Sequence, residues 1–241
     1  MKKTLLTGFL LTLIILSSYV LIVSLLDPGK AFKFIREDGI VENLQVVCYI
    51  VSTLLMLYIF IISRSGTGIY LFKTRMNWLY FFLAVFCIVI LGEEISWGER
   101  LFDYKATEKF QEAGGTSLHN REYLFKVFGI PITAARIYFP FVLSYFVVIP
   151  VLNEYSQKIR NFFTRISLPV IPILVAVLIF INFAVWQVSF RVFDHPEKWE
   201  SLPDYAFFQT AEEVYEVIFA LLLLWSSLAL YLKVRHNKSV S

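Results

Sequence analysis

The sequence has little of what the common catalytic and metal-binding motifs require. It contains only two cysteines and three histidines in 241 residues. Cys48 and Cys87 both lie inside apolar runs without CxxC or Cys/His spacing, so neither a disulfide framework nor a zinc knuckle is predicted. The sequence also lacks an HExxH pair and a GxSxG elbow, which excludes the usual zinc-protease and serine-hydrolase arrangements.

Charge is scarce as well. Charged residues make up 17% of the chain, against 58% hydrophobic and 17% aromatic residues. A soluble domain of this composition would expose large apolar patches, so the chain is predicted to be an integral membrane protein. The formal net charge of +3 is small and the basic residues form no single stripe, so a nucleic acid partner is not expected.

Six apolar segments are long enough to cross roughly 30 Å of hydrocarbon as helices. They lie near residues 4–26, 43–63, 77–97, 134–153, 166–188 and 208–232. The first is longer than the apolar core of a signal peptide and no small-x-small cleavage site follows it, so we predict a retained helix. The predicted fold class is an all-α integral membrane protein, a six-transmembrane-helix bundle in one domain over residues 1–241.

The distribution of lysine and arginine predicts the orientation, because cytoplasmic loops of membrane proteins are enriched in both residues. One side of the six-span topology collects eleven basic residues and a single acid, Glu154. The basic residues are Lys2, Lys3, Arg64, Lys73, Arg75, Lys158, Arg160, Arg165, Lys233, Arg235 and Lys238. The opposite side holds the other eighteen acidic residues. We therefore predict a multi-pass protein of the cell inner (plasma) membrane with both termini cytoplasmic.

The longest connection, residues 98–133, is predicted to be an extracytoplasmic loop. Gly114-Gly115 is a strong helix stop, and the following segment 121–129, "REYLFKVFG", alternates charged with aromatic residues. This pattern predicts a short amphipathic interfacial helix between the third and fourth spans, with Leu124, Phe125 and Phe128 toward lipid. Two proline pairs are expected to bend the fourth and fifth spans: Pro140 and Pro150, and Pro169 and Pro172.

Acidic side chains gather at the predicted outer ends of four segments. In "GEEISWGER" Glu93 and Glu94 end the third span, and helical steps of three, four and seven put Glu93 on one face with Ser96, Trp97 and Arg100. A carboxylate at membrane depth costs roughly 2.5–3.5 kcal/mol, so such groups usually face the bundle interior and find a partner. The sequence therefore predicts one polar chamber that opens toward the exterior.

The candidate site residues follow from this convergence. The catalytic candidates are Glu93, Glu94, His119, Glu213 and Glu216, and the substrate-binding candidates are Ser96, Trp97, Arg100, Asn120, Glu42 and Glu212. Neighbouring carboxylates cannot both ionise cheaply, so at least one is expected to keep its proton near neutral pH and to serve as general acid or base. Alternatively, a divalent metal ion would be held by Glu94, His119, Glu213 and His195 and would activate water.

At these residues the chain resembles a group of bacterial polytopic membrane proteins that carry an EEISWGxR motif. The likeness rests on "GEEISWGER", on "SLHN" some twenty residues later, on the acidic start of the second span and on "EEVYE" in the last. It covers most of the chain and implies a shared site without naming its chemistry. A looser similarity is to type II CAAX prenyl endopeptidases, whose paired glutamates precede an arginine. Here Arg100 follows Glu94 by six residues instead of four, so this similarity is an analogy of site style only.

Three classes of function remain open from the sequence. The leading hypothesis is an intramembrane hydrolase or transferase with a Glu/His/Arg site at the extracytoplasmic face, acting on a lipid or lipid-linked substrate. The second is a non-catalytic membrane subunit or assembly factor, in which a buried ion-pair network such as Glu93 with Arg100 fixes helix register. The third is a proton- or cation-coupled transporter, which the almost purely apolar cytoplasmic halves of the helices disfavour.

Overall fold

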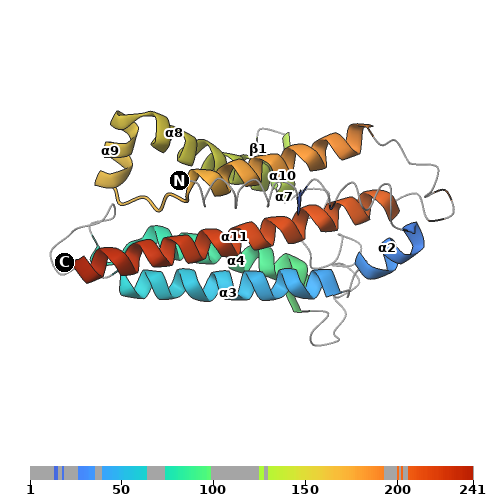
Figure 1. The fold of residues 1–241 in the computed structure, drawn as a ribbon, viewed down its shortest axis with the longest axis horizontal. Coiled ribbons are helices and arrows are strands. Elements are labelled where there is room, and N and C mark those ends of the chain that lie inside the picture. Colours follow the sequence, from blue (N-terminus) through green and yellow to red (C-terminus); the bar gives the residue numbers. More distant parts are fainter. Residues whose placement is uncertain are drawn as a thin grey trace. The chain divides into compact units, whose positions relative to one another are not determined.

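The computed structural model describes residues 14–15, 18, 27–35, 40–63, 74–98, 125–127, 130–192, 200, 202 and 206–240. These residues are mostly helical (Figure 1). The chain divides into two compact units, whose positions relative to each other the structure does not determine. Unit 1 comprises Met1–Cys48 and Ile171–Ala229, and unit 2 comprises Tyr49–Val170 and Leu230–Ser241. The first predicted span, 4–26, lies almost entirely outside the described residues.

Three helices of the described part are long and apolar enough to cross a membrane. They are α3 (Ile40–Ile62), the continuous helical segment Ala134–Tyr155, and the Ala206–Arg235 part of α11 (Ala206–Val240). A shorter apolar helix covers Ile173–Ser189. These findings support a membrane-embedded protein, whereas the count of six spans and the orientation of the termini stay predictions.

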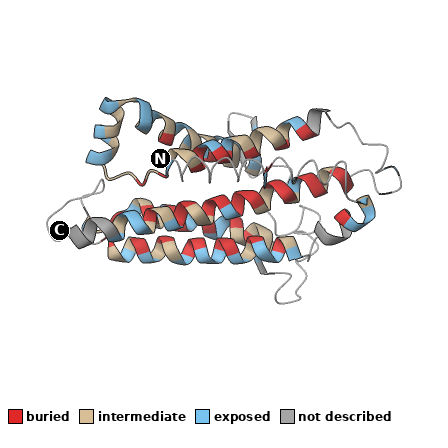
Figure 2. Cartoon of the chain, viewed as in Figure 1, coloured by how far each residue is buried: buried red, intermediate tan, exposed pale blue. Residues whose placement is uncertain are grey.

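Unit 1 is built around α10 (Ile173–Val192), the first turns of α3 and most of α11. Helix α2 (Pro28–Ile35) also belongs to it, and Asp27 begins this helix because its Oδ1 accepts hydrogen bonds from the backbone N–H groups of Gly29 and Lys30. Buried residues recur on successive turns of α11 (Figure 2), and Phe207, Phe219 and Leu223 are among its fully buried side chains. The core of unit 1 is therefore apolar along most of α11.

Helix α10 begins later than the sequence pattern indicates. The predicted span started at residue 166, but the helix starts at Ile173, after a turn at Ile166–Ser167 and the two prolines. The residue before a proline is disfavoured in the helical region, and both Leu168 and Ile171 occupy that position. Pro169 and Pro172 therefore precede the helix and do not bend it. The Pro172 carbonyl accepts the first hydrogen bonds of α10, from Val175 and Ala176.

Unit 2 contains the longest described run of packed aromatic rings. Its helices are the later turns of α3, then α4 (Trp78–Glu94), α7 (Ala134–Val142), η3 (Leu143–Val148), α8 (Ile149–Tyr155) and α9 (Gln157–Arg165). Phe86 of α4 packs against Phe141 and Phe146, with ring centroids 4.7 and 5.8 Å apart. Between Pro140 and Pro150 the helix widens into a π-helical segment, in which the Ile149 N–H reaches the Ser144 carbonyl.

The predicted interfacial helix between the third and fourth spans is wrong where the structure describes it. Phe125–Val127 (β1) and Ile130–Ile132 (β2) form an antiparallel pair, with Phe125 opposite Ile132 and Val127 opposite Ile130. The β-branched residues in both segments favour extended backbone. The two residues that separate the strands in the sequence include Gly129, which is typical of a tight hairpin connection. The remaining residues from 99 to 124 lie outside the described part.

Asn77 joins three segments at one end of unit 2. Its Oδ1 accepts a hydrogen bond from the Leu79 N–H and so caps α4, while its Nδ2 donates to the Ser167 carbonyl at 2.7 Å. Its backbone N–H donates to Oγ of Ser63, which follows α3. Asn77 and Ser63 are both buried. This hydrogen-bond hub fixes the end of α3, the start of α4 and the turn after α9 at one level.

Replacing Asn77 by alanine is expected to lower the free energy of unfolding by about 2 kcal/mol. The change removes an N-cap, which contributes about 1 kcal/mol, and leaves the Ser167 carbonyl without its amide donor, at a similar cost. Chemical unfolding of the purified protein in detergent measures the difference. Asn161→Ala on the exposed side of α9 is the control and should change stability by less than about 0.5 kcal/mol. Equal effects of the two variants would contradict the role of the hub.

Candidate functional site

The segment "GEEISWG" ends α4 with a left-handed turn. The helix stops at Glu94, and Ser96 and Trp97 have φ values of 46° and 52°. Left-handed backbone costs a residue with a Cβ roughly 1–2 kcal/mol. Two such residues in succession are maintained only when surrounding contacts favour them, and strained positions of this kind cluster at functional sites.

The Trp97 side chain supplies those contacts by folding back onto the last turn of α4. Its Nε1–H donates a hydrogen bond to Glu93 Oε1 at 2.5 Å. A Cβ built on Gly92 would lie 3.0 Å from three atoms of the indole ring, so the ring lies directly on the glycine. Glycine at position 92 thus allows the indole to cover the helix and to orient the Glu93 carboxylate. The Trp97 side chain is 41% exposed.

The helical face predicted for this stretch is only partly correct. Trp97 does contact Glu93, as a spacing of four residues predicts. However, the left-handed turn takes Ser96 and Trp97 off the helix, so they do not continue one helical face beyond Glu94. Glu93, Glu94 and Ser96 are half-buried. Arg100, the predicted fourth member of the face, lies outside the described residues.

A second polar group lies inside unit 1, where the start of α3 meets the start of α11. The Gln45 side chain is fully buried, and its Nε2 donates to the backbone carbonyl of Glu213 at 3.3 Å and to Glu213 Oε2 at 3.4 Å. Glu42, one helical turn before Gln45, is 6% exposed. From α10, the buried Asn182 donates through Nδ2 to the Tyr215 carbonyl at 2.9 Å. Asn182 thus joins α10 to α11, as Gln45 joins α3 to α11.

The side-chain amides of Gln45 and Asn182 both donate hydrogen bonds to backbone carbonyls of α11. In the described part of the chain Gln45 Oε1 and Asn182 Oδ1 are buried and accept no hydrogen bond. The ring of Trp186, one turn after Asn182 on α10, is stacked on the ring of Tyr215 with centroids 4.8 Å apart. Buried acceptors without a donor are costly, so they are suited to a protonated carboxyl, a hydroxyl or an ammonium group.

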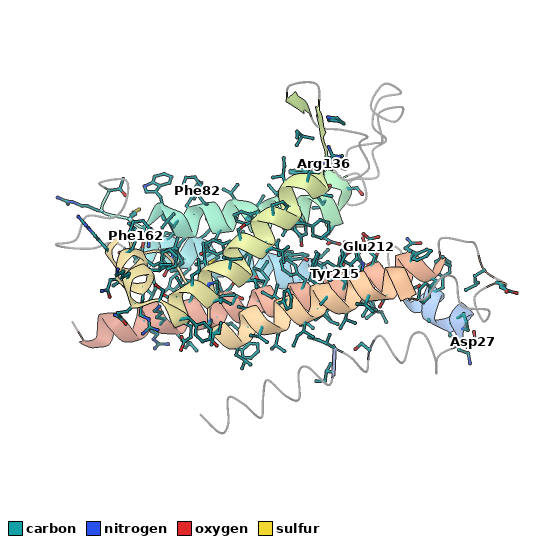
Figure 3. All side chains as sticks on the ribbon, turned by 90° about the horizontal axis from the view of Figure 1, so that it is seen from above. Asp27, Phe82, Arg136, Phe162, Glu212 and Tyr215 are labelled. Carbon is teal, nitrogen blue, oxygen red and sulfur yellow. The ribbon has the colours of Figure 1, made fainter. Side chains whose placement is uncertain are left out.

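The other predicted residues of the last span differ in exposure. Glu213 and Glu216 are half-buried, whereas Glu212 is exposed. Figure 3 shows Glu212 and Tyr215 on α11. The three carboxylates therefore differ in burial, although Glu216 lies four residues after Glu212 and three after Glu213 and so shares one side of α11 with both. His119, Asn120 and His195 lie outside the described residues, so their predicted roles stay predictions.

The structure groups the predicted acids into two sets. Glu42 and Glu213 belong to unit 1, where Gln45, three residues after Glu42, bonds to the Glu213 side chain. Glu93 and Glu94 belong to unit 2. The predicted single chamber that unites the third span with the last therefore stays a prediction. Of the predicted metal ligands, only Glu94 and Glu213 are described, and the described residues include no group of three or more metal-ligating side chains arranged to hold an ion.

Sequence reasoning missed Gln45 and Asn182 as site residues. Asn182 is a lone amide in the apolar run 173–186, and polar groups at membrane depth are rare enough to indicate a function or an interhelical bond. Gln45 follows Glu42 by three residues and so shares its helical face. This spacing was the available signal.

No protein-family model matches the chain, and comparisons with curated proteins and with solved structures find no similar protein.

Proposed function

We propose that the protein is a membrane-embedded hydrolase or transferase that uses glutamate side chains on a lipid or lipid-linked substrate at the extracytoplasmic face. The observation that carries the proposal is the hydrogen bond from the Trp97 indole to the Glu93 carboxylate. Trp97 lies on a turn with two left-handed residues, and Glu93 lies on the last turn of α4. A carboxylate whose rotamer is fixed in this way is preorganised for proton transfer. The proposed site also includes Glu94, and His119, Arg100, Glu213 and Glu216 stay the further candidates that the sequence predicts.

The proposed reaction follows from the chemistry of paired carboxylates. One ionised glutamate accepts a proton from water, or from an acceptor hydroxyl in a transferase, while the oxygen attacks the acyl or phosphoryl centre of the substrate. The bond to the leaving alkoxide breaks, and a second, protonated glutamate gives that oxygen its proton. Glu93 and Glu94 are the pair best suited to these roles, because they are adjacent and half-buried.

A non-catalytic subunit or assembly factor is the second candidate, and one observation favours it. The Gln45 and Asn182 amides both donate to backbone carbonyls of α11, which is the usual way for polar side chains to join helices in membranes. Such bonds contribute about 0.6–2 kcal/mol each. If the protein is non-catalytic, the carboxylates serve only in a structural hydrogen-bond network. Conservative substitutions of these carboxylates then change the stability of the protein and no activity.

Lipid analysis in labelled water separates the two candidates. We expect the purified protein, reconstituted in vesicles of total lipid from the cells that make it, to convert one lipid class over time. Mass spectrometry in H₂¹⁸O detects the product. A hydrolase introduces one labelled oxygen into the product, and a transferase forms a new unlabelled lipid. The same lipid profile with and without the protein would contradict the enzyme and favour the structural role.

A further inference from the structure

Helix α9 is amphipathic and buries none of its side chains. Its sequence is QKIRNFFTR. Ile159, Phe162 and Phe163 recur at spacings of three and four, so they lie on one face. Phe162 is 56% exposed, and Tyr155, which ends the preceding span, is 83% exposed. A helix of this kind needs a partner for its apolar side.

The position of α9 in unit 2 indicates which partner is available. The helix follows the membrane-length segment Ala134–Tyr155 after one residue, Ser156, whose extended backbone redirects the chain (Figure 1). In Figure 3 Phe162 and Arg136 lie near opposite ends of that segment. The 2.7 Å bond from Asn77 to the Ser167 carbonyl ties the end of α9 to the start of α4. There Trp78 is 37% exposed, and tryptophan and tyrosine are the side chains that concentrate at membrane–water interfaces.

The charged residues of α9 indicate the chemical nature of this partner. Lys158 and Arg165 are seven residues apart, so both border the apolar face on the same side, and both are exposed. Arg160 lies at the other border and is already engaged, because its guanidinium donates to the carbonyls of Asn153 and Glu154 at the end of α8. The only acid near this helix in the sequence is Glu154. The two exposed cations complement the phosphates of an anionic membrane surface, and the exposed aromatic ring beside them complements its acyl chains.

We propose that α9 lies in the plane of the membrane at its basic, cytoplasmic interface and binds the phosphates of anionic phospholipids through Lys158 and Arg165. Phe162 and Ile159 insert between the acyl chains, and Arg160 keeps α9 docked on the end of α8. The proposal rests on the predicted orientation and does not depend on the proposed enzymatic function.

A fluorescent label at position 162 tests the proposal in the full-length protein. Cys48 and Cys87 are buried, so a Phe162→Cys variant accepts an environment-sensitive thiol label selectively. We reconstitute it in vesicles of phosphatidylcholine and phosphatidylglycerol in equal amounts, with brominated chains on one lipid at a time. Both brominated lipids should quench the label, and brominated phosphatidylglycerol should quench it about twofold more or better, since each basic residue near the surface favours anionic lipid. Raised salt should reduce this preference.

Two charge variants make the result specific to α9. Lys158→Gln with Arg165→Gln should remove the preference for phosphatidylglycerol but retain quenching by both lipids. Lys233→Gln with Arg235→Gln removes two exposed charges from α11 in the same unit and should leave the preference unchanged. Absence of quenching, or equal quenching by the two lipids in the parent protein, overturns the proposal. A second label at Tyr155→Cys, a position that is 83% exposed at the end of α8, repeats the test if position 162 does not tolerate the dye.

Discussion

Replacing Glu93 by glutamine is expected to lower the turnover of the proposed reaction about 10²-fold or more, with little change in thermal stability. Glutamine keeps an Oε1 that can accept the hydrogen bond from the Trp97 indole, so the local structure persists. It cannot take up a proton, so the general acid–base step is lost. Initial rates in the labelled-water lipid assay and the melting temperature in detergent measure the two effects separately.

Two further variants control this prediction. Glu93→Ala should lose both activity and stability, because it also removes the acceptor of the indole bond. Glu154→Gln alters an exposed acid at the predicted cytoplasmic side and should affect neither. If Glu93→Gln retains full activity, or if its only effect is a lower melting temperature, the carboxylate is structural and the second candidate function is favoured.

The apolar helices of this protein are predictable because hydropathy sets both their position and their length. The predicted spans 43–63 and 134–153 match α3 and the segment Ala134–Tyr155 to within three residues at each end. Errors occur where local backbone chemistry overrides hydropathy. Ile166–Pro172 is apolar enough for a span, yet the residues before its two prolines disfavour helix, and the helix starts at Ile173.

The hairpin at β1 and β2 was missed for a related reason. In a segment as short as "REYLFKVFG" an alternation of charged and aromatic residues fits an amphipathic helix as well as a strand. The β-branched residues Val127, Ile130 and Ile132 and the intervening Gly129 favoured the hairpin. The short length of this segment was the usable evidence against a helix, because an isolated helix of fewer than about twelve residues is marginal in water.

The candidate sites depend on information that local patterns do not carry. The bond from Gln45 to Glu213 joins residues 168 positions apart, and hydropathy does not specify which helices are neighbours. The turn at Ser96 and Trp97 has a different cause. Left-handed backbone is normally assigned to glycine, and here a hydrogen bond and ring packing stabilise it instead. The contact between Glu93 and Trp97 was predicted from helical spacing, although the backbone that makes it is not helical.

Replacing Gly92 by leucine is expected to displace the Trp97 ring and to uncouple it from Glu93. The added Cβ alone would lie 3.0 Å from three ring atoms, and the rest of the leucine side chain has no room beneath the indole. Inserting atoms into a packed site costs about 1–3 kcal/mol. Removing a helical glycine recovers about 1 kcal/mol, so the net loss of stability should be about 0–2 kcal/mol. Activity should fall at least as far as in Trp97→Ala, because both changes release Glu93.

A double-mutant cycle tests whether this loss acts through the indole. In a Trp97→Ala background the ring is absent, so Gly92→Leu should cost no stability there and should gain the helix-propensity term instead. The coupling energy, measured from chemical unfolding in detergent, should therefore exceed the single-variant loss by this helix-propensity term, up to about 1 kcal/mol. Gly92→Ala, which adds only the Cβ, should fall between the parent protein and Gly92→Leu. An equal loss from Gly92→Leu in both backgrounds would mean that position 92 packs against another group. The Trp97 indole would then not be what holds Glu93 in place.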